Sequence, residues 1–202
     1  MTAAEYLKEK EFFIFELDNV IYPEKDYLLQ VYYLFAQFIE YGEQISAVDI
    51  LKYMQDYYLE HGDKDTFEKT AAKFSIHENY KVNFDMLLHS VRLPLKLLIY
   101  NEVSALMQAI VLERKKIFLF VQGNKAMQLN KIKQTDWKGL EQYLTVFFTE
   151  EFEPENDALK LIMQQYQLDI RKALLIGNTT FAETSSRVNN MDYLNVNELF
   201  VR

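Results

Sequence analysis

The stretch Phe12-Phe13-Ile14-Phe15-Glu16-Leu17-Asp18-Asn19-Val20-Ile21-Tyr22-Pro23 joins an apolar run to two carboxylates. The run has the length and the aromatic and β-branched content of a buried strand, and the Asn and Pro that follow predict a turn and a new element. Ligands of parallel α/β sheets bind beyond the carboxyl ends of the strands. Glu16 and Asp18 are therefore candidates for a chemical role, and a strand end that simply meets solvent is the alternative.

Strand and helix patterns alternate through the second half of the chain. Strict alternation predicts a parallel sheet with right-handed crossovers, which is a Rossmann-like α/β core. We expect strands at 12–17, 117–121, 144–148, 173–176 and 193–196, and helices at 102–112, 124–134, 156–166 and 180–188.

The region between the first strand and this alternating half has a different character. Apolar residues recur there at steps of three and four, which predicts amphipathic helices. We therefore expect an α/β core over 1–22 and 92–202 and an inserted, all-helical subdomain over 23–91. This region is rich in tyrosine, and an aromatic side chain there either packs or stacks on a planar ligand. The first apolar stripe consists of Leu28, Val31, Tyr32, Phe35, Phe38 and Ile39.

Composition excludes several classes of function. The 202 residues include no cysteine, so disulfides, thiolate metal sites and cysteine nucleophiles are excluded. The formal net charge of -8 disfavours a nucleic-acid partner or an anionic membrane surface, because both rely on Lys and Arg. No apolar run is long enough to span a bilayer, and no basic segment leads into an apolar signal region. We expect a soluble, cytoplasmic protein.

The first strand and its carboxylates resemble the first motif of the haloacid dehalogenase (HAD) superfamily of phosphohydrolases. The segment from Leu17 to Pro23 is similar to the version in the pyrimidine-nucleotidase-like members. The resemblance implies that Glu16 stands at the position of the nucleophilic aspartate and that Asp18 is the general acid/base. It also implies that the helical insertion is a cap, which in this family closes over the active site and helps to select the substrate.

The later strand ends are similar to the remaining HAD motifs, with substitutions. Val121-Gln122-Gly123-Asn124 resembles the phosphate-binding motif, but Val121 stands at the hydroxyl position. Glu153 stands at the position of the phosphate-binding lysine. Asn178 and Glu183 replace aspartates of the metal motif. The resemblance thus implies phosphate-binding positions at Val121, Gln122, Gly123 and Glu153, and metal-ligand positions at Glu16, Asp18, Asn178 and Glu183.

These substitutions weaken each part of phosphoryl-transfer chemistry, which needs an in-line carboxylate, a divalent cation and cationic or hydrogen-bonding groups around the phosphate. The side chain of Glu16 is longer than that of the aspartate in the family motif, which displaces the carboxylate. A displacement of about 1 Å can lower the reaction rate on the order of 100-fold. A carboxylate at the position of the lysine repels phosphate, since two unit charges about 4 Å apart interact by about 4 kcal/mol at an effective dielectric of about 20.

Three functions remain open. The first is a HAD-like protein with degraded phosphatase motifs that is catalytically impaired, or that binds a small molecule or a protein at its cleft and cap without catalysis. The second is a Mg²⁺-dependent hydrolase of small phosphate esters or nucleotides that uses Glu16 as its nucleophile. The third is an assembly role through aromatic surface on the cap. A carboxylate cluster at the strand ends would bind a cation such as Mg²⁺, take up protons or stay hydrated.

Overall fold

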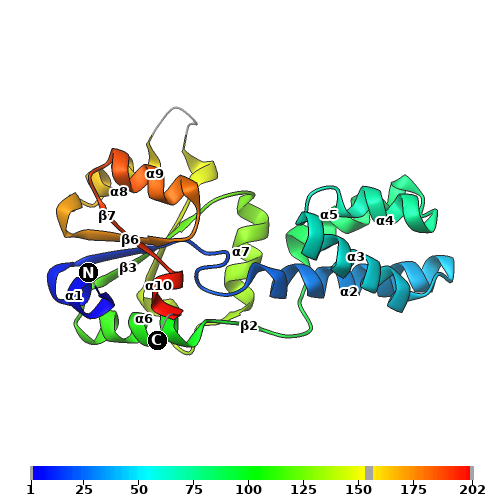
Figure 1. Ribbon diagram of the computed structural model, residues 1–202, viewed down its shortest axis with the longest axis horizontal. Helices are drawn as coiled ribbons and strands as arrows, with labels where there is room; N and C mark the ends of the chain where they lie inside the picture. Colours follow the sequence, from blue (N-terminus) through cyan, green and yellow to red (C-terminus); the bar gives the residue numbers. More distant parts are fainter. Residues whose placement is uncertain (1, 153–156, 201–202) are drawn as a thin grey trace. The chain divides into compact units, whose positions relative to one another are not determined.

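The computed structural model describes residues 2–152 and 157–200 (Figure 1). The chain divides into two compact units. The first, called the α/β unit, consists of Met1–Pro23, Leu98–Gln128 and Thr135–Arg202. The second, called the helical unit, consists of Glu24–Leu97 and Leu129–Gln134.

The α/β unit is built on a five-stranded parallel sheet in the order β5-β3-β1-β6-β7. β1 lies in the centre of the sheet, where Ile14 pairs in register with Phe118 of β3 and Leu175 of β6. This arrangement confirms the predicted Rossmann-like α/β fold class. The strands are β1 (Phe12–Phe15), β3 (Lys116–Val121), β5 (Leu144–Phe148), β6 (Ala173–Gly177) and β7 (Asp192–Asn195).

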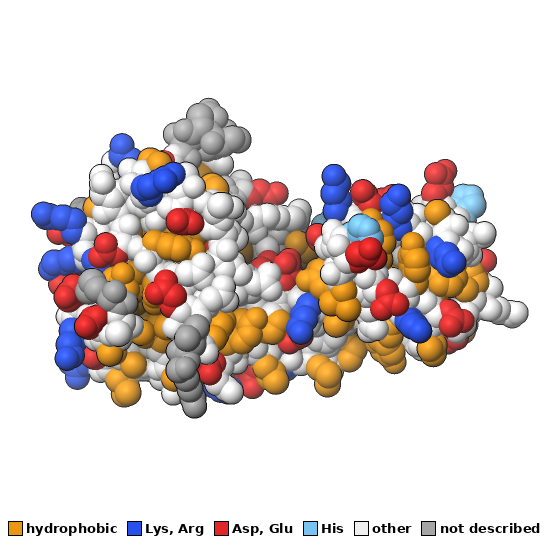
Figure 2. All heavy atoms as spheres, in the orientation of Figure 1, with side chains coloured by type: hydrophobic (Ala, Val, Ile, Leu, Met, Phe, Trp, Pro, Cys, Tyr) orange, Lys and Arg blue, Asp and Glu red, His pale blue; other side chains and the backbone are white. Residues whose placement is uncertain are grey.

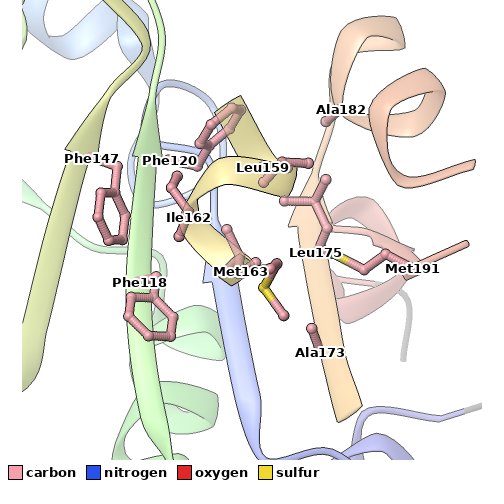
Figure 3. Packing of buried hydrophobic residues seen from close by; sticks show 11 residues of the cluster. Phe118, Phe120, Phe147, Leu159, Ile162, Met163, Ala173, Leu175, Ala182 and Met191 are labelled. Atoms are coloured by element: carbon pink, nitrogen blue, oxygen red, sulfur yellow. The ribbon is translucent and has the colours of Figure 1, made fainter. Parts of the chain in front are cut away.

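Helices cover both faces of this sheet, which explains why its strands are apolar on both sides. Figure 1 shows α8 (Ala158–Gln165) and α9 (Thr180–Val188) on one face, and α1 (Ala3–Glu9), α6 (Asn101–Leu112) and α10 (Asn197–Phe200) on the other. Apolar side chains of α8 reach the strands beneath them, as Figure 3 shows for Ile162 beside Phe118 and Phe120. The core on this face also includes Ile14, Phe147, Leu159, Met163, Ala173, Leu175, Ala182 and Met191.

The helical unit has a core of aromatic rings. Phe35 lies on α2, and its ring centroid is 5.8 Å from that of Phe67 on α4 and 5.1 Å from that of Phe84 on α5. The ring of Tyr32 stacks on that of Phe84, with 6.2 Å between the ring centroids. One aromatic cluster thus joins α2, α4 and α5. The helices of this unit are α2 (Glu24–Glu43), α3 (Ala47–His61), α4 (Thr66–Phe74) and α5 (Lys81–Ser90), together with the last part of α7 (Lys125–Gln134).

The observed units and the predicted domains share most of their residues but differ at three places. Pro23 lies in the α/β unit, whereas it is predicted to open the helical subdomain. Residues 92–97 and Leu129–Gln134 lie in the helical unit, whereas the sequence analysis assigns them to the core. A separate two-stranded sheet consists of β2 (Leu97–Leu98) and β4 (Thr135–Asp136), two short strands that the sequence pattern does not predict. None of the helices in the described ranges combines the length and the apolar character needed to cross a membrane.

Candidate functional site at the carboxyl end of the central strand

Glu16 follows directly on β1 and is held in line with the neighbouring strand. Its backbone N–H donates to the carbonyl oxygen of Ile176 on β6 at 3.0 Å, so the ladder continues one residue beyond the end of β1. The residue is only 5% exposed. A buried carboxylate needs hydrogen-bond donors around it, and three neighbouring residues supply them.

The Glu16 carboxylate accepts four hydrogen bonds. Oε1 accepts from Nε2 of Gln122 at 2.9 Å and from the hydroxyl of Thr179 at 2.6 Å. Oε2 accepts from the backbone N–H groups of Asn178 at 3.0 Å and Thr179 at 3.2 Å. A carboxylate offers about four lone-pair positions, so these donors occupy all of them. The side chain thereby links the ends of β1, β3 and β6.

Two of these donors lie at the start of α9. Thr179 is the N-cap of this helix, and its hydroxyl accepts from the N–H of Ala182 at 3.0 Å while it donates to Glu16. The first N–H groups of a helix have no partner within the helix, and the positive end of the helix dipole favours a carboxylate nearby. Glu16 therefore stabilises the first turn of α9 from outside that helix.

Asp18 lies in a turn beyond Glu16 and is also engaged. Its Oδ1 accepts from the hydroxyl of Tyr22 at 3.1 Å, and its Oδ2 accepts from Nε2 of Gln128 at 2.8 Å. Asn19 has a φ of +59°, a left-handed conformation that Asn tolerates better than most residues. This turn places the Asp18 carboxylate next to α7.

Gln128 joins the predicted first and second motifs, and the sequence analysis missed it. The same Nε2 that donates to Asp18 also donates to the carbonyl oxygen of Gln122 at 2.8 Å. Its Oε1 is buried and has no hydrogen-bond partner among the residues that the structure describes. Position 128 is one helical turn beyond Asn124 in the second motif, and this spacing is the signal that could have identified it.

The other predicted positions contribute in different ways. Val121 is the last residue of β3 and is fully buried, whereas Gly123 has a φ of +89° that favours glycine. The side-chain amide of Asn178 donates to the carbonyl oxygen of Asn19 at 3.3 Å. Glu183 lies on α9 and is exposed. The structure thus brings together Glu16, Asp18, Gln122 and Asn178, and Glu153 lies outside the described residues.

The phenol of Tyr193 on β7 has a raised pKa, mainly because it is buried. Burial raises the pKa of its phenol to about 12, and the charges of Glu16, Glu183 and Glu198 act in the same direction. The phenol therefore stays protonated and uncharged well above neutral pH.

The residues present do not fit a Mg²⁺ ion in this arrangement. Mg²⁺ requires near-octahedral oxygen ligands, but the Glu16 oxygens are occupied by protein donors and the Asp18 oxygens accept from Tyr22 and Gln128. Among the residues that the structure describes, no group of three His, Asp or Glu side chains could hold a metal ion.

Two of the three lysines of α7, Lys125 and Lys131, form contacts within the chain. Lys125, at the start of the helix, forms an ion pair with Glu151 in the α/β unit. Lys131 is fully buried in the helical unit, where its Nζ lies 3.5 Å from Glu24 and 5.1 Å from the ring centre of Tyr27. Both charges are already engaged within the chain.

Comparison with known proteins shows the fold. No protein-family model matches this chain, and no curated protein matches its sequence. Among solved structures, a hydrolase from Streptococcus pneumoniae TIGR4 is 15% identical, with a TM-score of 0.54 and 92% of each chain covered. YfnB of Bacillus subtilis, described as a HAD-hydrolase bound to magnesium, is 12% identical with a TM-score of 0.59, covering 92% of this chain and 86% of its own.

A haloacid dehalogenase shows the same likeness. The L-2-haloacid dehalogenase from Xanthobacter autotrophicus with covalently bound chloropropionic acid is 11% identical, with a TM-score of 0.53, 91% of this chain and 76% of its own covered. The resemblance seen in the sequence is thereby confirmed at the level of the fold: the chain has the fold of HAD-superfamily hydrolases and dehalogenases.

Proposed function

We propose that this chain is a HAD-fold protein that binds a small molecule or a protein and does not hydrolyse phosphate esters. The observation that carries the proposal is the environment of Glu16. A carboxylate that attacks phosphorus needs an oxygen with a free lone pair directed at the substrate. All four lone-pair positions of Glu16 are occupied by donors of the chain itself.

The surroundings of the site support the same reading. A hydrolase must neutralise the charge that develops on the transferred phosphoryl group with cations and donors. Here the hydroxyl position of the second motif is the buried Val121, and Lys125 is paired with Glu151. Gln128 extends between Asp18 and Gln122 at the strand ends, so amide groups hold this part of the site together.

The helical unit takes the role of a cap in this proposal, as the insertion does in the family that the sequence resembles. In a protein that does not hydrolyse phosphate esters, the helical unit would serve in binding or regulation. The third function considered from the sequence, assembly through aromatic surface, would be detected by a concentration-dependent mass.

The alternative is a Mg²⁺-dependent phosphohydrolase that uses Glu16 as nucleophile and Asp18 as acid/base. It is favoured by the position of both carboxylates just beyond the central strand and by the magnesium bound to the HAD-hydrolase YfnB. In this alternative Glu16 must exchange its internal hydrogen bonds for contacts with the ion and the substrate.

One assay separates the two functions. Purified protein is incubated with Mg²⁺ and an aryl phosphate or a panel of nucleoside monophosphates, beside the variants Glu16→Ala and Asp18→Asn. We expect the release of phosphate to be equal in all three proteins. Release by the wild type that both variants abolish would refute the proposal and establish Glu16 as the nucleophile. YfnB assayed in parallel reports whether the substrates and conditions suit a HAD-hydrolase.

A further inference from the structure

Two neighbouring hollows lie on the helical unit at the end of α5. One has a volume of about 430 Å³ and is lined by polar and cationic groups that include Arg92, Lys96 and Asn130. The other has a volume of about 330 Å³ and is lined by apolar groups that include Phe38 and Met86. Ser90 and Val91 line both hollows, so the two are adjacent. Each volume lies in the range of sites for small molecules, about 300–1,000 Å³.

Two exposed cations, Arg92 and Lys96, line the polar hollow. Arg92 and Lys96 are both exposed, and neither forms an ion pair or a hydrogen bond with any residue in the described ranges. The chain as a whole carries a formal net charge of -8, so a hollow lined by two cations differs in charge from the chain average. Two such cations at one hollow make it a local site of positive potential.

The end of α5 does not use these cations. Lys and Arg near a helix C-terminus commonly bind its last carbonyl groups. In this chain, neutral groups bind the carbonyl oxygens at the end of α5. The hydroxyl of Tyr27 donates to the carbonyl oxygen of Leu88 at 2.6 Å. The side-chain amides of Asn130 and Gln134 donate to the carbonyl oxygen of Val91 at 2.8 and 2.7 Å. The charges of Arg92 and Lys96 therefore remain available to a ligand.

The apolar hollow exposes hydrophobic side chains beside these cations. Phe38 of α2 is 41% exposed and Met86 of α5 is 60% exposed, and both line the hollow. Figure 2 shows hydrophobic side chains interspersed with charged ones over the surface of the helices from α2 to α5. Methionine is unbranched and polarizable, so it adapts to apolar ligands of different shapes.

We propose that this part of the helical unit binds a small organic anion with an apolar body. The anionic group, a carboxylate, sulfonate or phosphate, lies between Arg92 and Lys96, and the apolar body lies against Phe38 and Met86. Apolar contact supplies affinity and the two cations fix the orientation, as in other small-molecule sites. The residues that line this site belong to the helical unit and differ from those around Glu16, so the proposal stands whether or not Glu16 is catalytic.

The probe for this site is anilinonaphthalene sulfonate, a fluorescent molecule that carries an aromatic body and one anionic group. Titration into the full-length protein should give saturable binding of one molecule per chain. Octanoate should displace the probe, whereas acetate and octylamine should not, because acetate lacks the apolar body and octylamine carries the opposite charge.

Variants locate the binding. The double variant Arg92→Gln/Lys96→Gln should weaken the affinity for the probe by about fivefold or more, since two charge contacts are lost. The double variant Lys64→Gln/Lys73→Gln removes the same number of exposed positive charges elsewhere in the helical unit and should change the affinity less than about twofold. Met86→Ser should also weaken binding through the apolar hollow.

All substituted side chains are exposed, so the variants should retain the circular dichroism spectrum of the wild type. The proposal would be overturned if the folded wild type showed no saturable binding of the probe. It would also be overturned if Arg92→Gln/Lys96→Gln and the control Lys64→Gln/Lys73→Gln lost the same amount of affinity. The third contrary result is displacement of the probe by octylamine as effective as that by octanoate.

Discussion

The carboxylate of Glu16 fills the space next to the α-carbon of Gly177. A Cβ atom built on Gly177 would lie 2.5 Å from Oε2 of Glu16 and 2.9 Å from the Cβ of Ala182, both closer than real Cβ atoms approach other heavy atoms. The close approach of Glu16 to β6 therefore requires glycine at this position, although the backbone of Gly177 has no left-handed conformation that would require it.

Gly177→Ala should lower the free energy of unfolding by about 1–3 kcal/mol, the usual cost of adding a methyl group to a packed site. Urea unfolding measures this change. The double variant Gly177→Ala/Glu16→Ala provides the control, because removal of the Glu16 side chain makes room for the new methyl group. Its cost should be smaller than the sum of the two single costs. Strictly additive costs would show that the two residues do not compete for this space.

Glu16→Ala should destabilise the protein by about 2–4 kcal/mol. The substitution removes four hydrogen bonds and leaves the N–H groups of Asn178 and Thr179 without their acceptor. Glu183→Ala is the matched control, since this carboxylate also stands at a predicted metal position but is exposed on α9, and its loss should change stability by less than about 0.5 kcal/mol. Equal stability of the Glu16→Ala variant and the wild type would contradict a structural role for Glu16.

Mg²⁺ should leave the thermal midpoint of unfolding unchanged within about 1 °C, since a cation stabilises a protein only if it binds the folded state. The carboxylates that would bind it already accept hydrogen bonds from the chain. Differential scanning calorimetry over a series of Mg²⁺ concentrations tests this expectation, and YfnB serves as the positive control. A midpoint that rises with Mg²⁺ in the wild type but not in Asp18→Asn would establish a metal site at the strand ends.

Alkaline pH should destabilise the helical unit through Tyr32. Burial raises the pKa of this phenol from 10.0 to about 12. Between these values the unfolded chain releases the proton while the folded chain retains it, so the free energy of unfolding falls as the pH rises. Below pH 10 both states are protonated and the contribution is constant.

The variant Tyr32→Phe should show a shallower fall in stability between pH 10 and pH 12 than the wild type. Tyr41→Phe is the control, because Tyr41 is 92% exposed, and it should follow the wild-type curve. Denaturant unfolding at a series of pH values provides the comparison. Parallel curves for Tyr32→Phe and the wild type would mean that Tyr32 does not retain its proton in the folded state.

Much of the fold could be predicted because the core strands are long apolar runs separated by helical patterns. The apolar segment 144–148 predicts a strand, and it forms β5 (Leu144–Phe148). β1 ends at Phe15, two residues before the predicted end at Leu17. Glu16 and Leu17 are buried although they lie beyond the strand, and an apolar sequence does not show where strand pairing stops. The four-residue helix α10 is too short for periodicity to reveal.

The candidate site was predictable in its position but not in its connections. The resemblance implies positions in one site for Glu16, Gln122 and Asn178, and hydrogen bonds join them. Of the carboxylates considered as a cluster at the strand ends, Glu183 is exposed on α9 and Glu153 lies outside the described residues. The hydrogen bonds depend on side-chain rotamers, and some of them are formed by residues that belong to none of the sequence motifs. Thr179 is one such residue, although a threonine before a helical pattern is a recognisable N-cap.

The link between Glu16 and the first turn of α9 also restricts how this site can change over time. An aspartate at position 16 is one methylene shorter, so its carboxylate would withdraw from the N–H groups of Asn178 and Thr179 that Glu16 reaches. A single substitution toward the residue found in HAD phosphohydrolases would therefore cost stability before it supplied any chemistry. The hydrogen bonds of one side chain thus act as a barrier to substitution at position 16, and an aspartate there would require compensating changes elsewhere first.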